Sequence, residues 1–250
     1  MTPRDIDEAA ARLAAARCGA LLEALPTRAQ PSTFAEAAAI QKAILALLGE
    51  TAAGYKVAGT TPGTVMWGAI LRSRLQASPG TFPASVVPML GVEPEIAYRL
   101  ERDITAADRA MTLDEFDRLT SVVPAIEIVD SRFTSYDGTP LLHRAADLMS
   151  NGGLVHGEPW MEVHRADLPA LAVEVHAGGS LLAAKAGGHP AGDPRLPALA
   201  FLQAPGRPDL LPRGTLITTG SYAGLLRARP GDTVSARFVG YGSLAVSFAA

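Results

Sequence analysis

The sequence predicts an α+β fold in which a mixed, curled β-sheet carries helices on its outside and a helical region at its N-terminus. Two observations support this prediction. The first fifty residues show helical periodicity and capping signals, whereas the rest of the chain consists mostly of short β-type runs separated by Gly and Pro. The strands also outnumber the helices that could cross between them, so a doubly wound parallel sheet is not expected.

The N-terminal region, residues 1–50, is expected to be a helical arm of a single catalytic domain whose sheet core spans residues 51–250. Apolar residues recur at helical spacing over 5–24. A second helix is expected at 33–49, because Thr33 and Glu36 form a capping-box pattern and Gly49 closes the segment. Three further helices are expected at 112–119, 140–150 and 194–203.

Short β-type runs begin at "GYKVAG" and continue to the C-terminus. Strands are expected at 54–58, 92–100, 121–130, 171–177, 180–186, 215–219, 233–239 and 243–248. Two pairs of these runs are separated by glycine-containing turns, at Gly178–Gly179 and at Gly240–Gly242. Both pairs are therefore predicted to be β-hairpins.

Composition and charge narrow the choice of partners. The chain has 250 residues and a formal net charge of −3. Because it has no surplus of basic residues, binding to nucleic acid or to an anionic membrane is not expected. The single cysteine fits a reducing compartment. No signal-peptide pattern and no apolar run of about 18 residues is present, so a soluble cytoplasmic protein is expected.

Three glutamates stand in apolar β-type runs and are candidate metal ligands. Glu93 and Glu95 in "GVEPEIAYRL" would share one face of a strand, because side chains alternate between faces. Glu127 in "VVPAIEIVDSRF" stands in a strand that is apolar on both faces. Carboxylate oxygens suit Mg²⁺ or Mn²⁺. The alternative is a structural role, in which Arg99 and Arg132 neutralise the glutamates through salt bridges.

Lys56 in "GYKVAG" is a candidate catalytic residue. Only three of the 22 basic residues are lysines (Lys42, Lys56 and Lys185), and a lysine can be tuned towards a base whereas an arginine stays protonated. One interpretation is an active-site amine whose pKa is lowered by burial. The alternative is a lysine at a strand end that extends its ammonium group into solvent.

Other catalytic motifs are missing from the sequence. The five histidines show no HxH or HxxxH spacing, and neither a GxSxG elbow nor a dinucleotide or P-loop glycine pattern occurs. The turn in "LITTGSYAG" has a glycine that could let backbone N–H groups receive an oxyanion.

Taken together, "GYKVAG", "VEPEIAYRL", "PAIEIVDSRF", "ADLMSNGGLVHG" and "LITTGSYAG" resemble, in order and spacing, the 2-keto-4-pentenoate hydratases and 4-oxalocrotonate decarboxylases of the fumarylacetoacetate hydrolase superfamily. The resemblance runs from about residue 33 to the C-terminus. It implies the superfamily's curled mixed sheet, a role in aromatic catabolism and a homo-oligomer. It also implies site residues: Glu93, Glu95 and Glu127 as ligands of Mg²⁺ or Mn²⁺, Lys56 as the catalytic lysine, and Thr219, Gly220, Ser221 and Ser150 around the substrate.

The implied reaction is that of a lyase acting on a small 2-oxo or 2-hydroxydienoic acid. The metal would chelate the substrate's carboxylate and 2-oxygen and favour the enolate that hydration and decarboxylation share. Hydration is the first expectation and decarboxylation the alternative. C–C bond hydrolysis is disfavoured, because relatives that hydrolyse use a histidine upstream of the paired glutamates and this chain has none there.

Two departures from the family pattern allow a further alternative. Where the family usually reads "ADNASSG", Leu148 stands in place of an Asn, and no acidic residue occurs in 60–72. A catalytically weak homologue that binds metal and a keto acid, or acts as a partner subunit, is therefore also considered.

Overall fold

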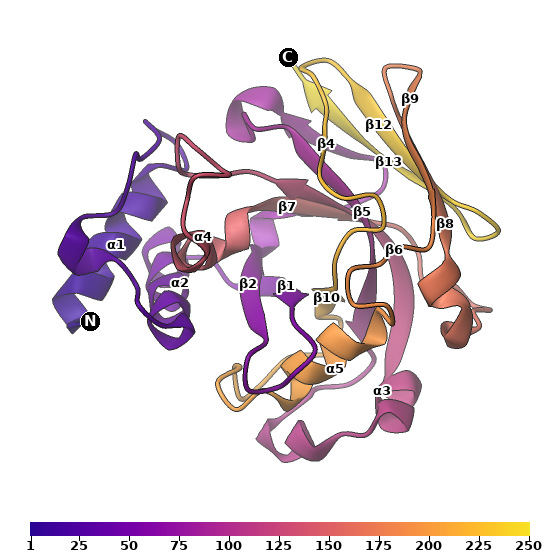
Figure 1. Cartoon of the computed structure of the whole chain (residues 1–250), viewed down its shortest axis with the longest axis horizontal. Coiled ribbons are helices and arrows are strands. Elements are labelled where there is room, and N and C mark those ends of the chain that lie inside the picture. Colours follow the sequence, from indigo (N-terminus) through magenta and orange to yellow (C-terminus); the bar gives the residue numbers. More distant parts are fainter.

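The larger of two β-sheets forms the centre of the computed structural model, which describes all residues 1–250 (Figure 1). Its strands lie in the spatial order β2-β1-β10-β5-β6-β7-β3, and β11 also pairs with β5. Their bounds are β1 (Ala52–Ala58), β2 (Met66–Leu71), β3 (Leu75–Ala77), β5 (Gly91–Leu100), β6 (Thr120–Val129), β7 (Asn151–His156), β10 (Leu216–Thr218) and β11 (Leu226–Arg227).

The smaller sheet has the order β4-β13-β12-β8-β9. Its strands are β4 (Gly80–Pro83), β8 (Ala172–Ala177), β9 (Ser180–Ala186), β12 (Thr233–Phe238) and β13 (Gly242–Ala249). Both expected hairpins are confirmed: β8 pairs with β9 across Gly178–Gly179, and β12 pairs with β13 across the turn at 239–241.

The pairing of strands is mixed, as predicted. Strand β1 runs parallel to β10, and β7 runs parallel to β3, whereas the β10–β5, β5–β6 and β6–β7 pairs are antiparallel. The long central pair β5–β6 is in register from Gly91 opposite Val129 to Leu100 opposite Thr120. The fold is the predicted α+β arrangement, a curled mixed sheet with helices outside it.

The helices form two groups (Figure 1). Helices α1 (Pro3–Ala15), α2 (Phe34–Leu48) and α4 (Leu141–Ala146) lie together at the N-terminal side, and α3 (Leu113–Leu119) and α5 (Arg195–Gln203) lie at the lower edge of the view. The first group shares a buried apolar cluster that includes Leu13, Ile40 and Ile44. The second group faces the main core, where Tyr98 packs against Phe116 and Tyr55 against Phe201.

A buried glutamine fastens α2 to the larger sheet. Gln41 donates hydrogen bonds from its amide to the carbonyl oxygens of Trp67, at 2.7 Å, and Ala145, at 2.8 Å. Its own oxygen accepts from the N–H of Ala69, at 3.1 Å. One side chain thus satisfies backbone groups of β2 and α4, which buried backbone requires.

Two predicted helices are too long. The helix expected at 5–24 ends at Ala15, because the backbone of Leu22 pairs instead with Arg132 and Thr134. The helix expected at 140–150 ends at Ala146, and 148–150 turn into the left-handed backbone region with φ of 50°, 54° and 58°. Tertiary contacts override helical periodicity in both segments.

Five strands were not predicted: β2, β3, β4, β7 and β11. Strand β2 is buried along nearly its whole length and so shows no alternation of apolar and polar residues. Strand β7 begins within "SNGG", which is typical of a turn. The other three have two to four residues, too few for a periodic signal.

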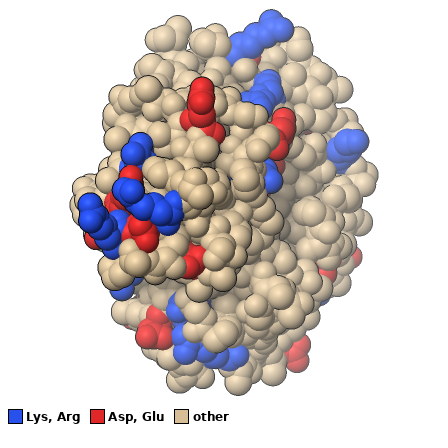
Figure 2. Space-filling view, turned by 60° about the vertical axis from the view of Figure 1, so that its left-hand side comes forward, with Lys and Arg blue, Asp and Glu red and all other residues tan.

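No helix in this structure combines the length and the apolarity that crossing a bilayer would take. Figure 2 shows one face of the molecule, on which acidic and basic side chains are interspersed and no large field of one sign is present. The small net charge of −3 agrees with this distribution.

Candidate active site

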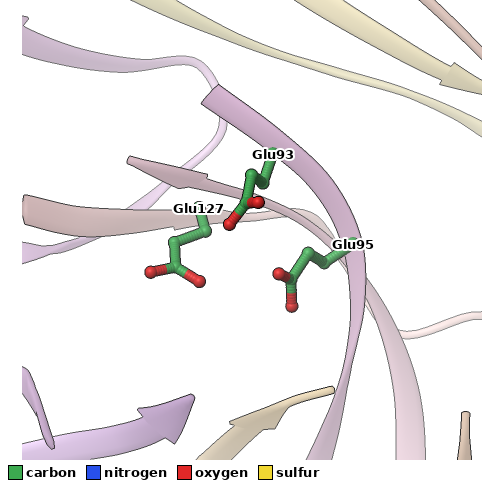
Figure 3. Close-up of side chains that lie close together, drawn as sticks. All are labelled: Glu93, Glu95 and Glu127. Carbon is green, nitrogen blue, oxygen red and sulfur yellow. The ribbon is translucent and has the colours of Figure 1, made fainter. Parts of the chain in front are cut away.

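Three carboxylates meet on the concave side of the β5–β6 pair. Glu93 lies directly opposite Glu127 in the register, and Glu95 follows on the same face of β5. One carboxylate oxygen from each lies within 4.8 Å of the other two, and Figure 3 shows the three side chains turned into one space. Because like charges directly opposite each other destabilise a sheet, this arrangement calls for a cation.

Burial increases the need for a cation. Glu127 has no exposed surface and Glu95 is only 2% exposed. Burial, and to a smaller degree the neighbouring carboxylates, raise the pKa of Glu95 well above its ordinary value. Burial also raises the pKa of Glu127 to about 7, despite the opposing effect of Lys56. The Oε2 atom of Glu127 is buried and accepts no hydrogen bond.

Lys56 reaches this site from the interior of β1. It pairs in register with Thr218 of β10, which pairs in turn with Ala97 of β5, so Lys56 shares a face with Glu95. Its Nζ atom lies 2.6 Å from Oε1 of Glu127. The ammonium group therefore points into the site, and the interpretation of a lysine extending into solvent is wrong.

The expected direction of the Lys56 pKa is also wrong. Burial alone lowers this pKa, but the negative charges of Glu127, Glu93 and Glu95 together outweigh burial and raise it. Lys56 is thus held as a cation against the carboxylates. The residues next to Lys56 in the sequence, Tyr55 and Val57, are uncharged. The three glutamates that raise its pKa lie on β5 and β6, far along the chain, so the local sequence could not predict their effect.

The salt-bridge alternative for the glutamates is contradicted. Arg99 pairs with Glu101 at 3.0 Å. Arg132 is fully buried and pairs with Asp147 at 2.6 Å and with Asp130 at 3.1 Å. Neither arginine neutralises Glu93, Glu95 or Glu127, so the cation that compensates the cluster within this chain is Lys56.

The site opens into a cavity of about 610 Å³. Glu93, Glu95 and Lys56 line one part of it. The other lining residues are Val57, Ala58, Tyr136, Met149, Lys185, Ala186, Gly187, Gly188, Pro190, Thr218, Gly220, Ser221, Tyr222, Ala223 and Gly224. Cavities of this size commonly hold small molecules.

The predicted substrate-binding turn supports the carboxylates. The N–H of Gly220, where φ is 119°, donates to Oε2 of Glu95 at 3.0 Å, so it is not free for a substrate oxyanion. The hydroxyl of Ser221 accepts from the N–H of Ala223 and lies within hydrogen-bonding distance of the Pro94 and Gly224 carbonyl oxygens. These contacts fix the turn beside Glu95.

Two predicted substrate-binding residues do not line the cavity. Thr219 is buried, and its hydroxyl lies 3.4 Å from Nε2 of His189. Ser150 is 1% exposed, and its hydroxyl has no hydrogen-bond partner. Thr218 and Met149, their neighbours in the chain, line the cavity instead.

The sequence did not single out Asn151, which stands beside the site. Its amide donates to Oε1 of Glu127 at 3.1 Å, and its backbone carbonyl accepts from Arg132 at 3.2 Å. Asn151 and Lys56 therefore both contact Oε1 of Glu127, whereas Oε2 of Glu127 has no partner and is available to a metal ion. The only signal for Asn151 was its place in the quoted motif "ADLMSNGG".

The segment before Asn151 has an unusual backbone. Leu148, Met149 and Ser150 all have positive φ, which costs L-residues about 1–2 kcal/mol each. Leu148 is buried in the main core, whereas Met149 faces the cavity. A Cβ atom at Gly68 of β2 would overlap the Leu148 carbonyl, so a glycine is required where this segment crosses β2.

The donor set fits a divalent cation. Three carboxylates supply hard oxygen atoms within one small space, and a buried, unpartnered oxygen of Glu127 is among them. The single ammonium group of Lys56 leaves a surplus of negative charge that a divalent ion would balance.

Curated relatives match most of the chain, although no family model does. A 4-oxalocrotonate decarboxylase from Pseudomonas putida is 28% identical over 232 residues, which cover 86% of each chain. A 2-keto-4-pentenoate hydratase from Paraburkholderia phymatum is 30% identical over 212 residues, 80% of this chain and 79% of the relative.

Solved structures share the fold. The 4-oxalocrotonate decarboxylase from Pseudomonas putida G7, complexed with magnesium and adipate, matches with a TM-score of 0.81 and 22% identity over 99% of this chain and 98% of its own. The 2-hydroxyhepta-2,4-diene-1,7-dioate isomerase from Mycobacterium marinum matches with a TM-score of 0.54 over 78% and 73% of the two chains. The chain belongs to the family of 2-keto-4-pentenoate hydratases and 4-oxalocrotonate decarboxylases.

Proposed function

We propose that this protein is a lyase that depends on Mg²⁺ or Mn²⁺, held by Glu93, Glu95 and Glu127, and that it acts on a 2-oxo or 2-hydroxydienoic acid. The observation that carries the proposal is the convergence of three carboxylates within 4.8 Å, with Lys56 against one of them, at a cavity of about 610 Å³. The bound ion would supply Lewis-acid polarisation of the substrate's carboxylate and 2-oxygen.

The chain's own residues orient the ligands and handle the proton. The Gly220 N–H holds Glu95, and Asn151 holds Glu127. Lys56 lies at the cavity wall, where its ammonium group can donate a proton to the substrate carbon chain or stabilise a developing oxyanion. Thr219 and Ser150 are not assigned direct substrate contacts, because neither lines the cavity.

Hydration, in which water adds to the dienoate at C4, is the first candidate reaction. Decarboxylation is the second, because relatives of both kinds match this chain at similar identity. A catalytically weak partner subunit has less support than the sequence suggested. Leu148 does not face the cavity, and Asn151 provides an amide at Glu127 from three residues further along the chain.

We also propose a cytoplasmic homo-oligomer. The exposed free Cys18 fits a reducing compartment, and exposed leucines such as Leu47 and Leu181 fit contacts between copies. Sedimentation velocity would measure the assembly, and a monomer at micromolar concentration would contradict it.

The function is tested with a panel of 2-oxo acids, with and without Mg²⁺. Turnover of 2-hydroxypenta-2,4-dienoate and of 2-oxohex-3-enedioate is followed by ultraviolet absorbance, and products are identified by mass to separate gain of water from loss of carbon dioxide. Activity should disappear with a chelator and return with Mg²⁺ or Mn²⁺. Turnover that is indifferent to the metal, or none with any acid of the panel, would sink the proposal.

A further inference from the structure

A second lysine lines the same cavity and has no part in the site described above. Lys185 and Lys56 are the only cationic residues in the cavity wall. Lys56 forms an ion pair with Glu127, whereas Lys185 forms no ion pair in the structure. We propose that Lys185 binds the far carboxylate of the substrate, so that this enzyme selects dicarboxylic over monocarboxylic 2-oxo acids.

The position of Lys185 in the smaller sheet supports this role. Lys185 is opposite Val173 in the β8–β9 pair, and Val173 is fully buried, so both side chains project from the core-facing side of the sheet. Glu174, the acidic residue on the adjacent strand, belongs to the opposite face and pairs with Arg237. The ammonium group of Lys185 is therefore available at the rim of the cavity.

The charge balance of the cavity also supports it. The three carboxylates of the proposed metal site are balanced by a divalent ion and the Lys56 ammonium group. A monocarboxylic substrate adds one negative charge, and its carboxylate can coordinate the ion directly. A dicarboxylic substrate adds a second, distant charge, and Lys185 is the remaining cation of the cavity wall.

The same cavity also has apolar wall that suits a carbon chain. Val57, Ala58, Ala186, Pro190 and Ala223 provide apolar surface in the same cavity as Glu93 and Lys185. A substrate with its 2-oxo acid end at the metal and a carboxylate at the other end would place its apolar middle there. This inference rests on the proposed function and does not depend on whether the reaction is hydration or decarboxylation.

The test measures binding, so that it does not depend on turnover. Adipate and hexanoate have equal length and differ by one carboxylate. Their affinities for the Mg²⁺-loaded full chain are measured by calorimetry for the parent and for Lys185→Gln, Lys185→Arg and Lys42→Gln. Lys42 is another exposed lysine, on α2, that does not line this cavity, and so it is the matched control.

The parent should bind adipate about 3- to 10-fold more tightly than hexanoate, a range appropriate to an ion pair exposed to solvent. Lys185→Gln should remove this preference, whereas Lys185→Arg and Lys42→Gln should keep it. The preference should also shrink between about 0.05 M and about 0.5 M salt. In kinetics, Lys185→Gln should raise KM for a dicarboxylic substrate without lowering kcat, because the ion pair exists equally in the ground and transition states.

The outcomes separate this inference from the proposed function. If both acids bind only with Mg²⁺ and Lys185→Gln leaves their ratio unchanged or weakens both alike, the role of Lys185 is refuted and the metal site stands. If neither acid shows Mg²⁺-dependent binding, the proposed function fails, and the inference fails with it.

Discussion

Replacing Glu127 by Gln tests the metal site most directly. The substitution keeps the shape of a side chain that has no exposed surface and removes one of three converging negative charges. Two opposite effects should follow. The protein without metal should be no less stable than the parent, because a buried carboxylate with a raised pKa is lost from a repulsive cluster. Metal affinity should fall steeply.

The size of the loss follows from the geometry. A unit charge about 4 Å from another contributes about 4 kcal/mol at an effective dielectric constant near 20, and a divalent ion doubles this value. Part of this loss is recovered, because the amide oxygen of the introduced Gln can still coordinate the ion. A net loss of about 4 kcal/mol, or roughly 10³-fold in affinity, is expected.

Titration with Mn²⁺ by calorimetry measures the affinity, and thermal unfolding measures the stability. At a metal concentration about 100 times Kd, the parent should gain about 2.7 kcal/mol, or about 5–10 °C in Tm. The Glu127→Gln variant should show no such rise. Glu101→Gln is the control, because Glu101 is paired with Arg99 outside the site. Unchanged Mn²⁺ affinity in Glu127→Gln would refute the ligand assignment and the electrostatic reasoning.

Four further predictions concern other parts of the molecule. Lys56→Arg and Lys56→Ala should each reduce kcat by about 10²–10⁴-fold with Mn²⁺ binding largely kept, and near-parent activity in either variant would exclude proton transfer by Lys56. Gln41→Met should lower the free energy of unfolding by about 2–4 kcal/mol in urea denaturation, because buried backbone groups lose their partners; a loss below that of the partly exposed control Gln76→Met would contradict this. A chain that starts at residue 50 should aggregate or dissociate, since it exposes the apolar surface that α1 and α2 cover, and sedimentation like that of the parent would argue against this. Burial lowers the pKa of His189 to about 4, so its neutral form favours folding: stability should be full above pH ~6.5 and fall as the pH drops from ~6.5 to ~4. His189→Gln should flatten that fall in a series of unfolding curves, and an unchanged pH profile would count against the burial argument.

Strand periodicity alone predicted part of the site. It placed Glu93 and Glu95 on one face, and β5 confirms this. Periodicity could not predict that Glu127 lies opposite Glu93, because register between strands separated by a helix depends on tertiary pairing. The resemblance to a known family provided that link. Three-dimensional contacts then reversed the expected pKa shift of Lys56.

The fold class and most long elements could be predicted from hydrophobic patterns and capping residues, as α2 and β5 illustrate. Elements that depend on tertiary partners could not. The helix expected at 5–24 is cut short by the pairing of Leu22 with the chain at 132–134. Gln41 gave no signal either, because a polar residue on a helix face is usually exposed, and its partners are backbone groups far along the sequence.

The left-handed turn at 148–150 has a practical consequence for anyone who wishes to alter the substrate range. Met149 projects into the cavity from a backbone that Gly68 and the Arg132 contacts hold in place. A library that varies Met149 would reshape the chamber without moving its walls. A library that varies Gly68 would displace the turn and carry Asn151 away from Glu127. Variants of Met149 should therefore change which substrates fit, whereas variants of Gly68 should disturb the proposed metal site itself.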